Sequence, residues 1–358
     1  MLTGSQAAAR SGHGFATAAV VGAGLMGRGI AGVLAAGGLD VVLFDTQPDV
    51  LAQAVAEATS ALTTATAATA ATATSEGTAR RGHVSGSAQL SVAVTGADLV
   101  VEAVVESLPV KQDVIERISA AAPGAVIATN TSVLAVTAIA ERAHDPRRVL
   151  GTHWWNPPDL IPVVEVVNGL LTAEDVIARV MALLGDLGKT PVRVRRDVPG
   201  FIGNRLQHAL WREAIALVAD GICDADTADL VARNTIGLRL ARMGPLENAD
   251  YVGLDLTLAI HDAVFPSLST DGTPSPALRA LVRRGHLGAK TGQGFLPWAA
   301  GSRETAAREL AAHVGAQEPS RAARCCDSAR GTPATGSQPT DSQPTKNPRA
   351  GDEKGTLA

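Results

Sequence analysis

The sequence predicts an α/β fold, a doubly wound Rossmann-type parallel sheet that is followed by an all-helical C-terminal domain. Three observations carry this prediction. Near the start of the chain, a run of small and β-branched residues leads into a glycine-rich turn and then into a helical pattern. Strand and helix patterns alternate from there to about residue 197, which is typical of a parallel sheet. After Val198-Pro199-Gly200 only helical periodicity remains.

The glycine-rich turn is Gly22-Ala23-Gly24-Leu25-Met26-Gly27, directly after a predicted strand. In a nucleotide-binding βαβ unit, Gly22 permits the tight turn, Gly24 lets the backbone approach a pyrophosphate, and Gly27 allows close packing of helix on strand. The start of the helix offers free N–H groups and positive dipole to phosphates. We therefore expect this segment, Leu25 and Met26 included, to bind a dinucleotide. A tight turn that packs a helix without any ligand is the alternative.

A second predicted strand identifies the dinucleotide. Val41 to Phe44 is a buried run that ends in Asp45, 23 residues after Gly22. A carboxylate at a spacing of about 20 residues is expected on the adenosine ribose. Asp45 would accept hydrogen bonds from the ribose hydroxyls and repel a 2′-phosphate, which predicts NAD rather than NADP.

The other elements of the first domain follow in order, each as an apolar run or a helical period. We expect a helix from Pro48 to about Thr69, strands at Leu90 to Val94 and Asp98 to Val101, a helix from Leu108 to Ala121, strands at Ala125 to Ala128, Val149 to Gly151 and Ile161 to Val167, a helix from Ala173 to Leu184, and a strand at Pro191 to Val194. Asn130-Thr131-Ser132 are polar residues at the carboxyl end of a strand, where open α/β sheets place their ligands. We expect Asn130 to contact the cofactor.

The chain divides into two folded domains with unstructured ends. We expect a disordered arm over residues 1–14, the NAD-binding domain over 15–197, a helical substrate and dimerisation domain over 198–316, and a disordered tail over 317–358. The helical domain is predicted from periodicity at Asn204 to Ala219, Ala225 to Arg233, Leu246 to Ala263 and Ala277 to Arg284. The tail has almost no large apolar residue, so it cannot offset its ordering entropy.

Composition narrows the class of protein. The formal net charge is −4 with no basic block, so neither nucleic acid nor an anionic membrane surface is expected as a partner. The three cysteines form no CxxC pair and no disulfide framework, which favours a reducing cytoplasm and argues against a metal site. No signal core and no 18-residue apolar span is present, so we expect a soluble, unprocessed, cytoplasmic protein.

One histidine stands out as a candidate base. A Rossmann domain needs a hydride partner, and hydride transfer from an alcohol needs a base for the hydroxyl proton. His153 lies at a predicted strand end beside Asn156, and Glu165 lies on the next strand, where a short hairpin could join the two side chains. A carboxylate on one imidazole nitrogen fixes the tautomer and raises the basicity of the other. A lone histidine would more often be a satisfied core or surface residue.

Seven segments over residues 16–298 together resemble the L-3-hydroxyacyl-CoA dehydrogenase family. They are VVGAGLMGRGIA, DLVVEAVVESLPVK, ATNTS, GTHWWNPP with IPVVEVV, PGFIGNRL, MGPLENADYVGLD and GAKTGQGF. The resemblance implies that NAD oxidises the 3-hydroxyl of a small-molecule substrate, and that two copies pair through the helical domain. It also implies roles for six residues: base (His153), orienting carboxylate (Glu165), ligands of the substrate oxygen (Ser132, Asn204), and contacts to the nicotinamide half of the cofactor (Glu106, Lys111).

Two departures from the family pattern leave the substrate open. The family presents a serine and a lysine to coenzyme A from the helix after the ribose carboxylate, and Ala61 and Ala68 stand there instead. Arg80 or Arg81 could supply the lost charge. The Trp154-Trp155 pair and its surroundings look more like the branch that contains carnitine dehydrogenase, L-gulonate dehydrogenase and lambda-crystallin. We therefore keep three hypotheses: a 3-hydroxyacyl-CoA dehydrogenase, a dehydrogenase of a free hydroxy acid, and a non-enzymatic NAD-binding protein.

Overall fold

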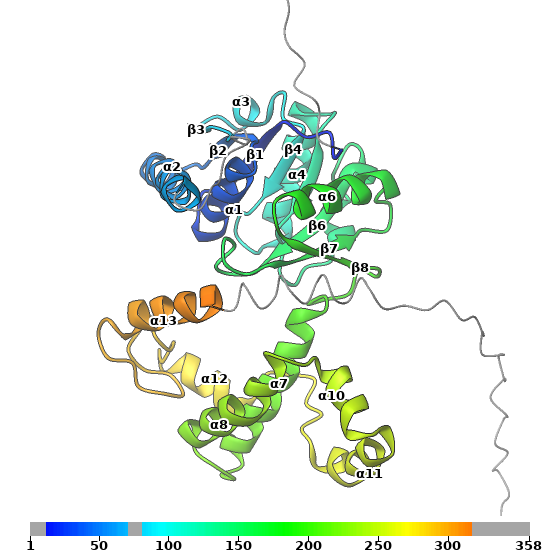
Figure 1. Ribbon diagram of the computed structural model, residues 1–358, viewed down its shortest axis with the longest axis vertical. Helices are drawn as coiled ribbons and strands as arrows, with labels where there is room; N and C mark the ends of the chain where they lie inside the picture. The colour runs from blue at the N-terminus through cyan, green and yellow to red at the C-terminus, as the bar shows by residue number, and fades with distance from the viewer. Residues whose placement is uncertain (1–11, 71–80, 317–358) are drawn as a thin grey trace, which may run out of the picture. The chain divides into compact units, whose positions relative to one another are not determined.

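The computed structural model describes residues 12–70 and 81–316 (Figure 1). The chain divides into two compact units, residues 1–314 and 315–358, and almost all described residues belong to the first. Residues 1–11 of the predicted arm, the predicted tail and Arg80 lie outside the described residues.

A single eight-stranded sheet organises the first domain, and its strand order is β3-β2-β1-β4-β5-β6-β7-β8. The strands are β1 (Thr17–Val21), β2 (Asp40–Phe44), β3 (Val84–Ser87), β4 (Leu99–Glu102), β5 (Val126–Thr129), β6 (Val149–Trp154), β7 (Val163–Asn168) and β8 (Thr190–Val194). The first six strands pair in parallel, β7 runs antiparallel to β6, and β8 is parallel to β7. The predicted doubly wound sheet with a helical C-terminal domain is confirmed.

Helices connect the strands of this sheet and make up the chain after it. In the first domain they are α1 (Leu25–Ala36), α2 (Pro48–Ala70), α3 (Leu90–Val94), α4 (Leu108–Ala121), α5 (Val136–Ala140), η1 (Pro146–Arg148) and α6 (Glu174–Asp186). After it come α7 (Gly203–Ala219), α8 (Ala225–Ala232), η2 (Arg233–Gly237), α9 (Leu238–Leu240), α10 (Pro245–Val252), α11 (Leu254–Val264), η3 (Phe265–Ser267), α12 (Pro276–Arg283) and α13 (Ser302–Ala316). None of the helices in the described ranges is long and apolar enough to cross a membrane.

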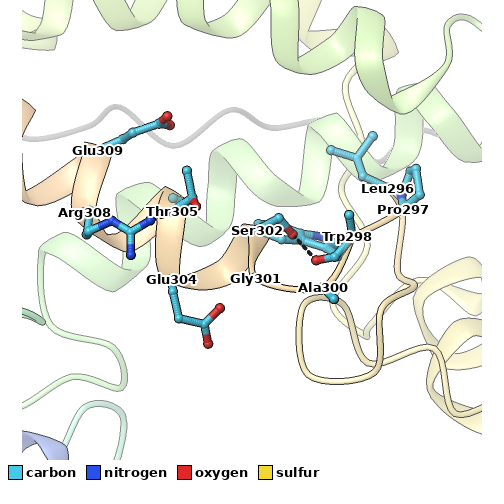
Figure 2. A pocket seen from close by; sticks show the side chains of 12 residues that line it. Leu296, Pro297, Trp298, Ala300, Gly301, Ser302, Glu304, Thr305, Arg308 and Glu309 are labelled. Atoms are coloured by element: carbon cyan, nitrogen blue, oxygen red, sulfur yellow. Dashed lines mark hydrogen bonds between the residues drawn. The ribbon is translucent and has the colours of Figure 1, made fainter.

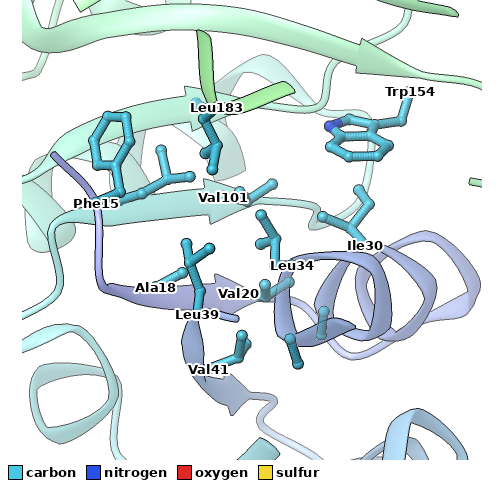
Figure 3. Close-up of a cluster of buried hydrophobic side chains, with 14 of the residues drawn as sticks. Phe15, Ala18, Val20, Ile30, Leu34, Leu39, Val41, Val101, Trp154 and Leu183 are labelled. Carbon is cyan, nitrogen blue, oxygen red and sulfur yellow. The ribbon is translucent and has the colours of Figure 1, made fainter. Parts of the chain in front are cut away.

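Each face of the sheet packs against its own set of helices. On one face, α1, α2 and α6 bury side chains such as Leu34 and Leu183 against Val20 and Val101, as Figure 3 shows. On the other face, α3, α4 and α5 pack against residues such as Val100. Burial on both faces explains why the strands read as continuous apolar runs rather than as alternating ones.

Two expectations about secondary structure are wrong. Leu90 to Val94 forms the short helix α3 and not a strand, because Leu90, Ala93 and Val94 are buried at helical spacing while Val92 is exposed. The strand of this part of the chain is β3, which ends three residues before α3 begins. The predicted single helix Leu246 to Ala263 is two helices, because Gly253 adopts φ 106° between them. The short helix α5 and the long helix α13 were not predicted.

The helical domain buries almost nothing within one chain. Among the described residues after Phe201, Val314 is the only buried hydrophobic one. By contrast, large apolar side chains such as Leu246, Tyr251 and Leu258 are exposed along α10 and α11. The hydrophobic content of the sequence fits two modest cores, but a single copy of the chain forms only the core around the sheet.

The first described residues contact the sheet domain, although the sequence places them in the disordered arm. His13 is buried, its Nδ1 atom accepts the Phe15 N–H at 3.1 Å, and its Nε2 atom lies 3.7 Å from the Asp186 carboxylate. Arg179 lies over the Phe15 ring and donates to the His13 carbonyl oxygen. The folded domain therefore begins at or before His13.

We expect this contact to weaken in mild acid. Burial lowers the pKa of His13, Asp186 opposes that shift, and Arg179 adds to it. The unfolded chain therefore takes up the proton first, so stability is complete above the ordinary histidine pKa of about 6.5 and falls as the pH drops below it. Thermal unfolding at about pH 8 and about pH 5.5 should show a larger loss of Tm for the wild type than for His13→Gln. His83→Gln, at an exposed histidine, should behave like the wild type; equal pH dependence in all three proteins would contradict the prediction.

Candidate active site

The glycine-rich turn between β1 and α1 forms a cradle that larger residues could not form. Gly22 adopts φ 103°, and a Cβ atom there would lie 2.5 Å from the Ala103 carbonyl oxygen. A Cβ atom on Gly27 would lie 1.8 Å from the carbonyl oxygen of Gly22. Gly24 is exposed with open space around its Cα atom. The turn is thus tight on the protein side and open on the side where a phosphate group would approach.

The start of α1 presents its backbone to this open side. Gly24 is the N-cap and offers no side chain to the first N–H groups, and Leu25 is 54% exposed. Asp45 holds the loop from β2: one carboxylate oxygen accepts the Ala23 N–H at 2.9 Å and the other accepts the Gln47 N–H at 3.0 Å. Free N–H groups at a helix start, next to a carboxylate at the end of β2, fit the pyrophosphate and ribose of a dinucleotide.

His153 and Glu165 lie directly opposite each other on the antiparallel strands β6 and β7. The Nδ1 atom of His153 is 2.7 Å from the Oε2 atom of Glu165, and the two side chains are almost fully buried. The hairpin that the sequence allowed is therefore present, and it joins an imidazole to a carboxylate.

The carboxylate of Glu165 also caps the first helix of the helical domain. Its Oε1 atom accepts the N–H groups of Ile202 at 2.8 Å and Gly203 at 3.0 Å. Burial opposes ionisation of this group, but the hydrogen bonds from His153 and from the start of α7 outweigh it and hold the pKa of Glu165 below its usual range. An ionised carboxylate can only accept a hydrogen bond, so Nδ1 of His153 is the donor in this contact and Nε2 is the ring nitrogen that does not face Glu165.

Aromatic rings pack around the imidazole of His153. The ring centroids of Trp155 and Phe201 lie 4.8 Å and 5.7 Å from its own. Phe201 adopts φ 49°, rare for a residue with a side chain, and its buried ring lies among Val136, Val167 and Val194. A Cβ atom on Gly203 would lie 2.2 Å from the Trp155 ring. The imidazole is thus held by packing as well as by Glu165.

The backbone of Ser132 is held from both sides. The Oε1 atom of Glu106 accepts the N–H groups of Ser132 at 2.9 Å and Val133 at 3.1 Å, together with the Thr131 hydroxyl. The Asn204 side chain donates to the Ser132 carbonyl oxygen at 2.9 Å. Burial opposes ionisation of Glu106. The Thr131 hydroxyl, Lys111 and the two backbone N–H groups outweigh burial and hold the pKa of Glu106 below its usual range, so the carboxyl is ionised at neutral pH.

Lys111 and Asn130 both make contacts within the protein. The Lys111 side chain is fully buried and its Nζ atom lies 2.8 Å from Glu102 and 3.3 Å from Glu106. Asn130 uses its side-chain oxygen to accept the Trp154 N–H at 2.9 Å, which fixes the end of β6 next to His153. Both residues therefore support the site from within the protein.

An open surface hollow of about 990 Å³ lies elsewhere, between residues 296–301 and the first turns of α13 (Figure 2). Trp298, Ser302 and Arg308 are among its lining residues, and none of the predicted catalytic or cofactor residues lines it.

Sequence reasoning missed two residues of the site. Glu102 is a fully buried carboxylate at the end of β4, and a charged residue that closes an apolar strand could have indicated it. Phe201 packs on His153, although the sequence indicated it only as a residue of the PGFIGNRL segment at the start of the helical domain. No local signal shows that its ring turns back toward β6.

Two family models match consecutive parts of the chain. The model for the 3-hydroxyacyl-CoA dehydrogenase NAD binding domain matches residues 17–198, and the model for the 3-hydroxyacyl-CoA dehydrogenase C-terminal domain matches residues 200–298. The fold and these matches define an oxidoreductase that acts on CH–OH groups with NAD as its cofactor. The chain belongs to the 3-hydroxyacyl-CoA dehydrogenase family.

The relatives are named for several different substrates. A 5-formyl-3-hydroxy-2-methylpyridine 4-carboxylate 5-dehydrogenase of Mesorhizobium japonicum is 35% identical over 77% of this chain and 89% of its own. A probable 3-hydroxybutyryl-CoA dehydrogenase of Deinococcus radiodurans is 35% identical over 77% and 98%. An L-carnitine dehydrogenase of Streptomyces griseus is 37% identical over 71% and 75%. A crystal structure of an enzyme with the first of these activities covers 85% of this chain and 99% of its own, with 32% identity and a TM-score of 0.78.

Proposed function

We propose that this protein oxidises the 3-hydroxyl group of an L-3-hydroxyacyl-CoA to the ketone, with His153 as the general base. The observation that supports this most is the buried contact between His153 and Glu165. This contact orients the imidazole at the carboxyl end of the strands, the edge that also carries the dinucleotide cradle. NAD, when bound, supplies the hydride acceptor.

His153 and Glu165 serve proton transfer, and Ser132 and Asn204 position the substrate. The Nε2 atom of His153 takes the hydroxyl proton as the C–H bond breaks, and the ionised Glu165 stabilises the imidazolium that forms. Ser132 donates its hydroxyl to the substrate oxygen. The Asn204 amide has two N–H groups, so one can hold the Ser132 carbonyl oxygen while the other contacts the reacting carbonyl.

One contact favours a thioester of coenzyme A as the substrate. The guanidinium of Arg81 donates to the Leu62 carbonyl oxygen of α2 at 2.9 Å. Leu62 follows Ala61, one of the two positions where the family resemblance implies a contact to coenzyme A. Arg81 therefore places a cation on a helix that has no lysine or arginine of its own, and a cation is what the phosphates of coenzyme A require.

A free hydroxy acid is the second candidate. α2 carries acidic residues and no basic one, and Arg28, which faces it from α1, is paired with Glu57 at 2.9 Å. The relatives that act on carnitine and on a pyridine carboxylate show that the family fold also serves substrates without coenzyme A. In that case the protein recognises the substrate by its carboxylate and not by a nucleotide.

Substrate preference separates these candidates. We expect NADH formation with L-3-hydroxybutyryl-CoA and much less with free 3-hydroxybutyrate, carnitine or a hydroxymethylpyridine carboxylate. Arg81→Gln should raise KM for the thioester by about 10-fold to 150-fold, the range for one lost contact to a charged group, and leave kcat unchanged. Activity confined to free acids would move the protein to the second candidate, and NAD binding without any activity would favour the non-enzymatic hypothesis.

We propose that a second copy of the chain covers the helical domain. Tyr251 is 79% exposed and Leu254 and Leu258 are each 62% exposed, on helices that bury no residue in a single copy. Apolar surface on this scale is typical of an interface that forms with folding. Light scattering of the purified protein should give the mass of a dimer, and Leu254→Asp should shift the protein toward monomer.

A further inference from the structure

The two proposed ligands of the substrate oxygen come from distant segments that meet in one place. Ser132 follows β5, and Asn204 lies at the start of α7, 72 residues later in the chain. The Asn204 amide donates to the Ser132 carbonyl oxygen at 2.9 Å. Because both side chains must reach the same substrate atom, the reaction depends on the spacing between these two segments. A residue that fixes the spacing would affect the reaction without touching the substrate.

Asp197 joins these two segments. It lies between β8 and α7, and its two carboxylate oxygens accept the Val136 N–H at 3.1 Å and the Thr137 N–H at 2.7 Å. Val136 and Thr137 are the first residues of α5, whose N-cap residue Ala135 has no side-chain acceptor of its own. Asp197 therefore caps, from a distant part of the sequence, the helix that follows the Ser132 segment.

The chain between Asp197 and Asn204 is held at two further points. The Phe201 ring is buried in one cluster with Val136, the residue whose N–H group Asp197 accepts. Glu165 accepts the two backbone N–H groups that follow Phe201. One end of this short segment is thus fixed to the start of α5, and the other end carries Asn204.

A cap that served stability alone could come from the residue next to the helix. Asp224 is such a cap: it is the N-cap residue of α8 and accepts the Thr227 N–H at 2.8 Å. The cap of α5 comes instead from the segment that leads to Asn204. The bond that completes α5 therefore also sets where the start of α7 lies relative to Ser132.

We propose that Asp197 is a positioning residue for Ser132 and Asn204. By holding the start of α5, it fixes the spacing between the two segments from which these side chains reach the substrate oxygen. This inference rests on the proposed function, in which both residues contact that oxygen. It assigns part of the catalytic geometry to the connection between the sheet domain and the helical domain.

The kinetic test is Asp197→Ala, assayed with L-3-hydroxybutyryl-CoA. We expect kcat to fall by about 10-fold to 30-fold, since misplacement of a reacting group by about 1 Å can cost about 100-fold. Asp224→Ala removes a cap of the same residue type from α8 and is the matched control, with kcat expected to stay within about 2-fold of the wild type. A kcat of Asp197→Ala within about 2-fold of the wild type, or an equal loss in Asp224→Ala, would overturn the inference.

A second background separates positioning from general damage. In Asn204→Ala the amide is absent, so Asp197→Ala should lower kcat by less than about 3-fold further, because the two changes act through one group. An equal loss in both backgrounds would show that Asp197 acts on the fold as a whole and would contradict the proposal. Full activity of Asn204→Ala alone would overturn the role proposed for Asn204 together with this inference, and that failure shows in the single variant.

Amide hydrogen exchange tests the contact without any substrate. In Asp197→Ala we expect the amides of Val136 and Thr137 to exchange faster by about 5-fold, the effect of one lost helix cap, and the Ser132 segment to exchange faster with them. Asp224→Ala should leave both unchanged. Unchanged exchange in Asp197→Ala would overturn the inference even if kcat falls. A wild type that does not oxidise the thioester would contradict the proposed function, and exchange would still show whether Asp197 holds the Ser132 segment.

Asp197→Asn guards against an alanine variant that does not fold. Asparagine has the same shape but a single acceptor oxygen, so its NH₂ group faces one of the two N–H groups of α5. We expect a lower kcat with the same dependence on Asn204. A wild-type kcat in Asp197→Asn would contradict the proposal.

Discussion

Replacing His153 with alanine is expected to lower kcat by about 1,000-fold, within the range of about 100-fold to 10,000-fold typical of a general base. Glu165 holds the imidazole at the carboxyl edge of the sheet, and in the proposed function its Nε2 atom accepts the substrate proton. The lost ring also leaves Glu165 without the donor on its Oε2 atom. Steady-state NADH formation with L-3-hydroxybutyryl-CoA measures the effect.

The control for this prediction is NAD affinity. The cradle is built by β1, α1 and Asp45 and not by His153, so the Kd for NAD, measured by quenching of tryptophan fluorescence, should stay within about 3-fold of the wild type. A kcat within about 10-fold of the wild type would show that another group takes the proton.

Glu165→Gln is expected to damage catalysis and stability together. The carboxylate serves three N–H groups: Nδ1 of His153, and the backbone of Ile202 and Gly203. A glutamine has one acceptor oxygen, so its NH₂ group must face either His153 or the start of α7, and each of these offers a donor. We expect kcat to fall by about 100-fold and the free energy of unfolding by about 1 to 3 kcal/mol, the cost of an unsatisfied buried donor.

The pH dependence gives this prediction a second readout. The hydrogen bonds of Glu165 hold its pKa below the usual value of about 4.3, so the stabilisation by the ionised carboxylate is complete above that pH and is lost as the pH falls through the lowered pKa. Glu165→Gln cannot show this loss, and its deficit in Tm should shrink in acid. A deficit that is constant with pH would mean that the carboxylate charge does not matter to the fold.

Much of the fold follows from the sequence because its signals are local. The glycine-rich turn and Asp45 place the cradle, and β6 and β7 place His153 opposite Glu165, since both depend on segments that are close in the chain. α3 could not be recognised as a helix, because five residues are too few for a period to show. The break at Gly253 could not be predicted either, because the hydrophobic pattern continues unchanged across this residue and does not indicate its positive φ.

The supporting residues of the site were harder to predict because their contacts are long range. Asn130, Glu106 and Lys111 stand at the expected strand and helix ends, but the sequence does not show that they bond to Trp154, to the Ser132 backbone and to Glu102. Phe201 packs on His153, and Glu165 caps α7 just beyond it. Such partners depend on how strands meet at the sheet edge, and this is tertiary information.

The missing core of the helical domain has a consequence for how the protein responds to dilution. If the proposed second copy covers α10 and α11, which bury no residue by themselves, these helices gain stability from the surface that it supplies, and this gain obeys mass action. The unfolding temperature of the helical domain should therefore rise with protein concentration, while the unfolding temperature of the sheet domain should not change. At low concentration in a cell, newly made chains would have a folded sheet domain and a helical domain that is not yet folded. The fraction of fully folded enzyme would then depend on its own concentration.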